Sequence, residues 1–300
     1  MHRPSPCSVT EAPADFAQRA KLIVDMITSP RMSSPLRTAL MALLLIGVSA
    51  STGSSEVPPR VVDVPTRPGV IQRFVLLSPR EPKATVVLFA GDHGGLQIAA
   101  GPRFTWGAGG LADNFLLRSR QLFVEHDLAV AIVDAPSDRQ FRFLAGFRQT
   151  PAHATDIKAV IAWLREHIEA PVWLIGTSMG TLSVGYLATQ LTGRDGPDGI
   201  VLTSTILTAE PGTRPVPAMA LERVRIPVLV VHHEQDGCRL CLFRDMPALM
   251  HKLDAVPRKE LIAVTGGVSR GDPCQAWAYH GYNGIEEAVV AQIAGWIVSR

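Results

Sequence analysis

The stretch Val172–Thr181, with the sequence VWLIGTSMGT, restricts the fold of this chain more than any other. Its apolar first half is typical of a buried strand, and the segment that follows, Leu182–Leu191, is compatible with a helix. Between them stands Gly-x-Ser-x-Gly, and the order strand, sharp turn, helix is that of a nucleophile elbow. Gly176 and Gly180 suit a place where strand and helix pass too closely for a Cβ atom. The stretch therefore predicts that Ser178 lies at the tip of a strained turn with its hydroxyl exposed.

Strands and helices alternate along the rest of the chain. The first two predicted strands are separated by a Thr-Arg-Pro-Gly turn signal, which predicts an antiparallel pair at the sheet edge. The alternation predicts an α/β fold with a mainly parallel central sheet flanked by helices on both faces, and an active site at the carboxyl ends of the strands. Strands are predicted over residues 61–65, 70–77, 84–90, 128–133, 171–175, 199–202, 227–231 and 260–264, and helices over 114–126, 155–167, 182–191, 246–253 and 284–299.

Composition places the chain among ordinary globular proteins. Its 300 residues are 47% hydrophobic and 19% charged, which one large domain accommodates. The formal net charge is +2, so charge gives no reason to expect nucleic acid or an anionic membrane surface as a partner.

The N-terminal region carries the pattern of an export signal. Leu36-Arg37-Thr38 is a charged start, residues 39–48 are an apolar run, and Val48-Ser49-Ala50 closes the run with small residues. This order predicts a signal peptide at about Met32–Ala50 and a periplasmic or secreted protein. The apolar run is too short to span a bilayer comfortably, so we expect no integral membrane segment in the mature chain. The alternative interpretation of the run is a buried core helix.

The domain organisation follows from this signal. We interpret Met1–Arg31 as an upstream extension or a misassigned start, because Met32 stands where a signal of ordinary length would begin. Residues 51–59 are rich in small residues and proline, which is typical of a linker. We therefore expect an N-terminal extension, signal peptide and linker over residues 1–56, and a single domain over residues 57–300.

Two later strands end in side chains that suit a reactive serine. A serine hydroxyl becomes a good nucleophile when a base removes its proton, and that base is usually a histidine oriented by an acid. The strand over 227–231 runs into the sequence HHEQDG, which holds Asp236, and the strand over 260–264 is followed by a long loop that reaches His280. The order Ser178, Asp236, His280 is the Ser–acid–His order of α/β-hydrolases.

These motifs resemble those of the α/β-hydrolase family, and the resemblance covers the chain from about Arg60 to Arg300. It is strongest with small esterases, lipases and dienelactone-hydrolase-like enzymes, although the full His-Gly-Gly-Gly motif of the lipase branch is missing. The resemblance implies that Ser178 is the nucleophile, His280 the general base and acid, and Asp236 the residue that orients His280.

Other acids stand near these positions. Glu234 is the alternative to Asp236, which is favoured because Gly237 after it suits a tight loop. Asp134 follows an earlier strand, whereas the family usually carries its acid after the later one.

Three further histidines are interpreted as structural. His232 and His233 are consecutive at a strand end, so one of the two must point away from the cleft. His153, at the start of a predicted helix, is expected to be exposed or to cap that helix.

The oxyanion of acyl transfer needs hydrogen-bond donors. One expected donor is the backbone N–H of Met179, directly after the nucleophile, and the other comes from the loop after the strand over 84–90. In that loop Asp92 is favoured and His93 is the alternative. The loop is otherwise a flexible turn, and no Lys-Ser or Lys-Thr follows it to indicate a phosphate loop.

Three cysteines follow the elbow. Export would place them in an oxidising compartment, where disulfides persist. If Asp236 bonds His280, their loops lie side by side, so a Cys238–Cys274 bridge is favoured. A Cys241–Cys274 bridge and three free thiols remain as alternatives.

A metal site is the rival interpretation of the residues between positions 232 and 241. Cys-x-x-Cys can hold zinc, but a second such pair or a His-x₃-His is missing, so no metal is expected. A redox Cys-x-x-Cys would lack the thioredoxin-like order of elements. The residues concerned are His232, His233, Asp236, Cys238 and Cys241.

The sequence as a whole predicts an exported serine hydrolase without a cofactor. It would cleave an ester or related acyl bond of a small molecule through an acyl-enzyme on Ser178. The alternative is a catalytically silent α/β-hydrolase fold that serves as a binding protein. The intact serine, acid and histidine favour the enzyme, and covalent capture by a serine-directed probe distinguishes the two.

Overall fold

An eight-stranded sheet forms the centre of the structure, a computed structural model that describes residues 57–99, 111–140, 146–209 and 211–299. The strands lie in the order β1-β2-β4-β3-β5-β6-β7-β8. The pairings of β1 with β2 and of β2 with β4 are antiparallel, and the other pairings are parallel. The strands are β1 Val57–Arg67, β2 Val70–Ser78, β3 Ala84–Phe89, β4 Leu128–Val133, β5 Val172–Thr177, β6 Gly199–Thr203, β7 Val228–His233 and β8 Lys259–Val264.

The central strands are buried on both faces. Every residue of β3, β4, β5, β6 and β7 is buried, and most of these residues are apolar. Continuous rather than alternating apolar runs are typical of parallel strands covered from both sides. The predicted α/β fold with its antiparallel edge pair is thereby confirmed.

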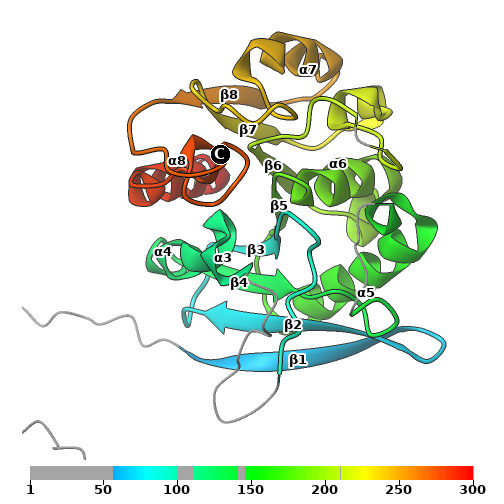
Figure 1. The fold of residues 1–300 in the computed structure, drawn as a ribbon. Helices are drawn as coiled ribbons and strands as arrows, with labels where there is room; N and C mark the ends of the chain where they lie inside the picture. The colour runs from blue at the N-terminus through cyan, green and yellow to red at the C-terminus, as the bar shows by residue number, and fades with distance from the viewer. Residues whose placement is uncertain (1–56, 100–110, 141–145, 210, 300) are drawn as a thin grey trace, which may run out of the picture. The chain divides into compact units, whose positions relative to one another are not determined.

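Helices cover both faces of the sheet (Figure 1). α5, α6 and α7 pack into one apolar core with strand residues such as Val87 and Leu174. α3, α4 and α8 pack into a second core with Val86 and Ile175, whose side chains leave the opposite face. The helices are α3 Phe115–Arg118, α4 Arg120–Glu125, α5 Pro151–His167, α6 Gly180–Gln190, α7 Met246–Lys252 and α8 Glu286–Val298. Short 3₁₀ turns are η1 Leu111–Asp113, η2 Phe147–Gln149, η3 Gly193–Asp195, η4 Val216–Ala218, η5 Leu221–Arg223, η6 Phe243–Asp245 and η7 Tyr279–Gly281.

The start of α5 corrects two predictions. The helix begins at Pro151 rather than Thr155, because the Thr150 side chain accepts a hydrogen bond from the N–H of His153 at 3.3 Å and proline suits the first turn. The prediction that His153 is exposed or caps the helix is wrong, since its side chain is buried and Thr150 is the cap. The helix predicted over 114–126 is divided at Ser119 into α3 and α4.

The predicted export signal and linker fall on residues 1–56, outside the described residues. Among the helices that the structure describes, none is long and apolar enough to cross a membrane.

Candidate active site

The predicted elbow lies between β5 and α6. Ser178 has a φ of +52°, in the left-handed region that non-glycine residues rarely occupy. Its N–H donates to the carbonyl of Thr203 at 3.1 Å, and the hydroxyl of Thr181 donates to the carbonyl of Ser178 at 2.6 Å. These contacts hold the strained residue in place. A serine with positive φ in a turn between a strand and a helix has the geometry of a nucleophile elbow.

The elbow glycines leave room for this turn. A Cβ at Gly176 would lie 2.6 Å from the carbonyl carbon of Gly180, and a Cβ at Gly180 would collide with the carbonyl oxygen of Phe89. β3, β5 and α6 therefore meet at separations that only glycine allows.

Asp236 and His280 come from the loops after β7 and β8 and meet each other. Nδ1 of His280 lies 2.8 Å from Oδ2 of Asp236, and both side chains are buried. In this contact Nδ1 is the nitrogen that suits a donor to the carboxylate, and in that tautomer of a neutral imidazole Nε2 is the acceptor. Within the described part of the chain that Nε2 is buried and has no hydrogen-bond partner. The ring is thus oriented to receive a proton at Nε2.

The loop that carries His280 is tied to the ends of two strands. The Ser204 hydroxyl donates to the carbonyl of His280 at 2.7 Å. The Tyr282 hydroxyl donates to the carbonyl of Val231 at 2.8 Å and accepts the N–H of Ser204 at 3.0 Å. Burial raises the pKa of Tyr282, so its phenol stays protonated and keeps donating. The sequence contains no signal that would have identified these supporting residues.

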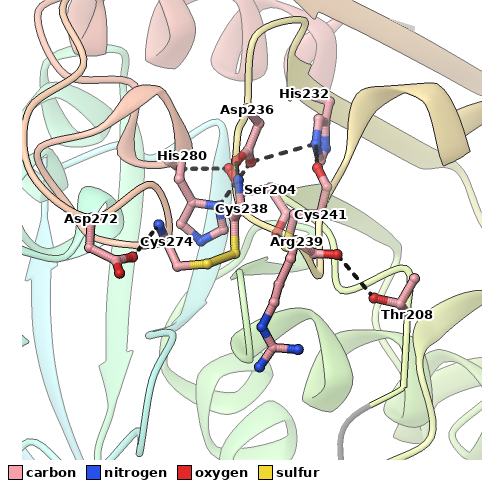
Figure 2. The surroundings of a disulfide bond; sticks show 10 residues. All are labelled: Ser204, Thr208, His232, Asp236, Cys238, Arg239, Cys241, Asp272, Cys274 and His280. Atoms are coloured by element: carbon pink, nitrogen blue, oxygen red, sulfur yellow. Dashed lines mark hydrogen bonds and ion pairs between the residues drawn. A yellow bond between two sulfur atoms is a disulfide. The ribbon is translucent and has the colours of Figure 1, made fainter.

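A disulfide joins Cys238 to Cys274 (Figure 2), which is the bridge favoured from the sequence. The two Cα atoms are 4.5 Å apart although 36 positions separate them along the chain. The bridge links the loop of Asp236 to the loop of His280 and limits their separation. Cys241 is the free cysteine of the described residues, and burial raises the pKa of its thiol.

His232 and His233 bond to backbone carbonyls rather than to each other. Nε2 of His232 donates to the carbonyl of Cys241 at 2.6 Å and lies 3.6 Å from Oδ2 of Asp236 (Figure 2). Burial lowers the pKa of His232 to about 4, against the opposing effect of the Asp236 charge. Nε2 of His233 lies 2.9 Å from the carbonyl of Gly266. Both contacts agree with the structural role expected for these histidines.

A pocket of about 220 Å³ lies beside the elbow, and Ser178, Met179, Asp92 and His280 line it together. Met179 follows the serine at the start of α6, and Asp92 lies in the loop after β3. Among the described residues, no backbone carbonyl accepts a hydrogen bond from the N–H of Met179 or of Asp92. Both groups are therefore candidate oxyanion donors. Leu111, Phe115 and Leu240 add apolar wall.

Arg148 is a buried residue beside this site that sequence reasoning missed. Its side chain is buried, with Nη1 donating to Oγ of Ser183 at 3.0 Å and Nη2 donating to the carbonyl of Ala90 at 2.8 Å. Burial lowers the pKa of Arg148 to about 10, opposed by the charge of Asp92, so the group is cationic at neutral pH. Ser183 belongs to α6 and Ala90 directly follows β3, so Arg148 connects the two elements that present Met179 and Asp92.

The rival acids lie elsewhere. Glu234 is exposed at the surface, whereas Asp236 contacts His280. Asp134 accepts hydrogen bonds from the backbone N–H groups of Leu96 and Ile98 at 2.6 and 2.8 Å and so shapes the loop after β3. Asp236 is thus the acid that contacts His280, whereas Asp134 accepts hydrogen bonds from the backbone of the loop after β3.

Comparison with known proteins identifies the fold. No protein-family model matches the sequence, and no curated protein matches it. An esterase from an Arctic intertidal metagenomic library is 17% identical with a TM-score of 0.52, over 79% of this chain and 93% of that one. Dienelactone hydrolase from Anabaena variabilis is 16% identical with a TM-score of 0.53, over 80% and 96%. An esterase from Pyrococcus furiosus is 12% identical with a TM-score of 0.56, over 80% and 91%.

These neighbours and the sheet order define the α/β-hydrolase fold. At such low identities the likeness concerns the fold, and the activity has to be argued from the site itself.

Proposed function

We propose that this chain is a serine hydrolase that cleaves an ester or related acyl bond through an acyl-enzyme on Ser178. The observation that carries the proposal is that His280, bonded to Asp236 through Nδ1, lines the same pocket as Ser178 and keeps Nε2 unpaired among the described residues. The esterase and dienelactone hydrolase neighbours agree with this chemistry.

The proposed reaction begins with attack of the Ser178 hydroxyl on the acyl carbon, while Nε2 of His280 takes the hydroxyl proton. The N–H groups of Met179 and Asp92 stabilise the oxyanion of the tetrahedral intermediate. His280 then returns the proton to the leaving group, and the acyl-enzyme remains. Water activated by the same nitrogen hydrolyses the acyl-enzyme. Asp236 accepts the hydrogen bond from Nδ1 and stabilises the imidazolium form of His280.

The proposal includes export to the periplasm or the medium. The supporting observation is the Cys238–Cys274 disulfide, because such bridges persist in oxidising compartments. N-terminal sequencing of the protein secreted by a bacterial host should find a mature start near Ser51. A mature chain that retains Leu43–Val48 would contradict a cleaved signal peptide.

The activity is tested with p-nitrophenyl esters of graded chain length and with a fluorophosphonate probe. Wild type should turn over and be labelled, whereas Ser178→Ala should lose labelling and about 10³-fold or more of kcat. Ser269→Ala, which removes an exposed serine outside the pocket, is the matched control and should behave as wild type. A Ser178→Ala protein with full activity would refute the assignment. A folded wild type without turnover or labelling would favour the binding-protein alternative.

A further inference from the structure

Two cysteine sulfurs lie beside the histidine of the candidate triad. One ligand atom from each of Cys238, Cys241 and His280 lies within 4.8 Å of the other two, and all three residues are buried. Figure 2 shows these residues in the surroundings of the disulfide. From this arrangement we propose that reduction of the Cys238–Cys274 disulfide creates a zinc site made of Cys238, Cys241 and His280, and that zinc bound there blocks the hydrolase.

The separation of the three groups suits zinc. Bonds of about 2.3 Å to sulfur and 2.0–2.1 Å to nitrogen place tetrahedral ligands roughly 3.5–3.8 Å apart. The ligand atoms of the three residues lie within 4.8 Å of one another, so they need to approach by about 1.0–1.3 Å at most. Two thiolates and an imidazole are a soft ligand set that favours zinc over magnesium or calcium.

The loop after β7 presents the two cysteines as a pair. They are separated by two residues, which is the Cys-x-x-Cys spacing of many zinc sites. The N–H of Cys241 donates to the carbonyl of Cys238 at 2.8 Å, so a tight turn already brings the two residues together. A preformed turn lowers the entropic cost of ordering the two cysteines when a metal binds.

The histidine also matches a zinc ligand. Its Nε2 is unpaired within the described chain, and its Nδ1 is bonded to Asp236 at 2.8 Å. Zinc-bound histidines commonly donate their second nitrogen to a carboxylate in this way. The Asp236–His280 pair that would orient a general base would therefore equally orient a metal ligand.

The disulfide controls access to the site. In the oxidised protein the sulfur of Cys238 is bonded to Cys274 and cannot ligate a metal. Reduction transfers two electrons to the bridge and yields two thiols, with a dithiol becoming its own disulfide and supplying the two protons, or a phosphine becoming a phosphine oxide while water supplies the oxygen and the two protons. Zinc then displaces one proton each from Cys238 and Cys241, and His280 supplies its lone pair. Both bridge cysteines line the pocket of Ser178, which gives a reductant a route to the bridge.

Zinc on the catalytic histidine removes the base that the reaction needs. This consequence rests on the proposed function, whereas zinc uptake does not. The oxidised enzyme should therefore be insensitive to micromolar zinc, and the reduced enzyme should lose about 100-fold or more of its kcat. Removal of zinc with EDTA should restore the reduced enzyme.

The test measures zinc per chain by mass spectrometry of the metal after dialysis, with tris(carboxyethyl)phosphine as the reductant. All proteins, including the one called wild type in this test, carry Cys7→Ser, so that this cysteine adds no thiol. Oxidised wild type should hold no zinc and reduced wild type about one per chain. Cys274→Ser, which frees Cys238 without reduction of a bridge, should hold one zinc without the phosphine when oxidants are excluded. Cys241→Ser keeps the bridge and the triad, and it should neither bind zinc after reduction nor be inhibited by it.

The outcomes separate this inference from the proposed function. Reduced wild type and Cys274→Ser without zinc, or a reduced Cys241→Ser that binds as much as wild type, would overturn the site. Ester turnover by the oxidised enzyme with no zinc uptake by the reduced one leaves the hydrolase in place and removes the zinc site. Stoichiometric zinc in a protein that never turns over esters removes the hydrolase and keeps the zinc site.

Discussion

Acid should destabilise the folded chain through two buried histidines, His153 and His232. Both side chains are buried, His153 at 5% exposure and His232 at 0%. Burial, together with the nearby Arg148 and Arg67 cations, lowers the pKa of His153 to about 3. Burial lowers the pKa of His232 to about 4, although the charge of Asp236 acts in the opposite direction. Both rings are therefore neutral in the folded protein at pH 5.

The free energy of unfolding should fall as the pH drops below the unfolded pKa of 6.5. Below that value the unfolded chain binds a proton on each histidine, whereas the folded chain does so only near the lowered values of about 3 and about 4. Stability is lost where the unfolded state binds more protons, at about 1.4 kcal/mol per pH unit and histidine. Between pH 8 and pH 5 each histidine should cost about 2 kcal/mol, and the two together about 4 kcal/mol.

His153→Phe isolates one of these contributions. The His153 ring meets Phe89 and Phe147 edge-on, with ring centroids 6.0 and 5.5 Å apart. Neither ring nitrogen of His153 has a hydrogen-bond partner within the described chain, so phenylalanine keeps the ring contacts and removes two unpaired polar atoms. At pH 8 the variant should match wild type within about 1 kcal/mol. At pH 5 it should be more stable than wild type by about 2 kcal/mol.

Urea unfolding followed by far-UV circular dichroism from pH 8 to pH 4.5 measures this difference. His251→Gln is the matched control, because the His251 side chain is 84% exposed and is in water in both states. Its acid sensitivity should equal that of wild type. A His153→Phe variant that loses as much stability as wild type between pH 8 and pH 5 would refute the assignment of this loss to His153.

Three further predictions concern the site. Arg148→Met should lower kcat for p-nitrophenyl acetate by about 10- to 100-fold with little change in KM, because the side chain no longer connects the two elements that present the oxyanion donors. Arg148→Lys should recover part of the lost kcat. If the number of active sites labelled by the fluorophosphonate fell by the same factor as kcat, the loss would instead indicate misfolding. Gly180→Ala should yield little soluble protein, because its Cβ would collide with the Phe89 carbonyl oxygen; normal yield and melting temperature would contradict that packing. Reduction of the disulfide in EDTA, which releases a loop closed over 36 positions, should lower the urea-derived free energy of unfolding by about 4 kcal/mol. An unchanged urea midpoint after complete reduction would contradict it.

The strands could be predicted from the sequence because each central strand is a closed apolar run. β4 spans Leu128–Val133, which are the residues predicted, since His126-Asp127 and Asp134 bound the run with polar side chains. The contact between Asp236 and His280 could also be predicted, because both residues follow later strands and the carboxyl ends of parallel strands meet at one edge. Helix boundaries depend on capping contacts, and the cap at Thr150 places the start of α5 at Pro151 instead of the predicted Thr155.

Buried polar side chains were the part that the sequence could not reveal. Arg148 lies in an irregular basic segment, where a surface position is the ordinary expectation. Its burial depends on the carbonyl of Ala90 and the hydroxyl of Ser183, which are 58 and 35 positions away in the chain. His153 is buried against Phe89 and Phe147 for a similar reason. Such positions are decided by tertiary packing, which leaves no local pattern.

The disulfide partner of Cys274 could be predicted from the expected contact between the acid and the histidine, but not from the spacing of the cysteines. Cys238 and Cys241 are three positions apart, so loop length hardly distinguishes them as partners of Cys274. The need for Asp236 to reach His280 brings the two loops together at Cys238, which lies two residues after the acid. The turn after it directs Cys241 inward, where its sulfur lies 3.4 Å from the carbonyl of Ser204. The contact between Asp236 and His280 therefore favours the Cys238–Cys274 bridge and leaves the buried thiol of Cys241 beside the histidine. The zinc site that we propose for the reduced protein depends on this remaining thiol.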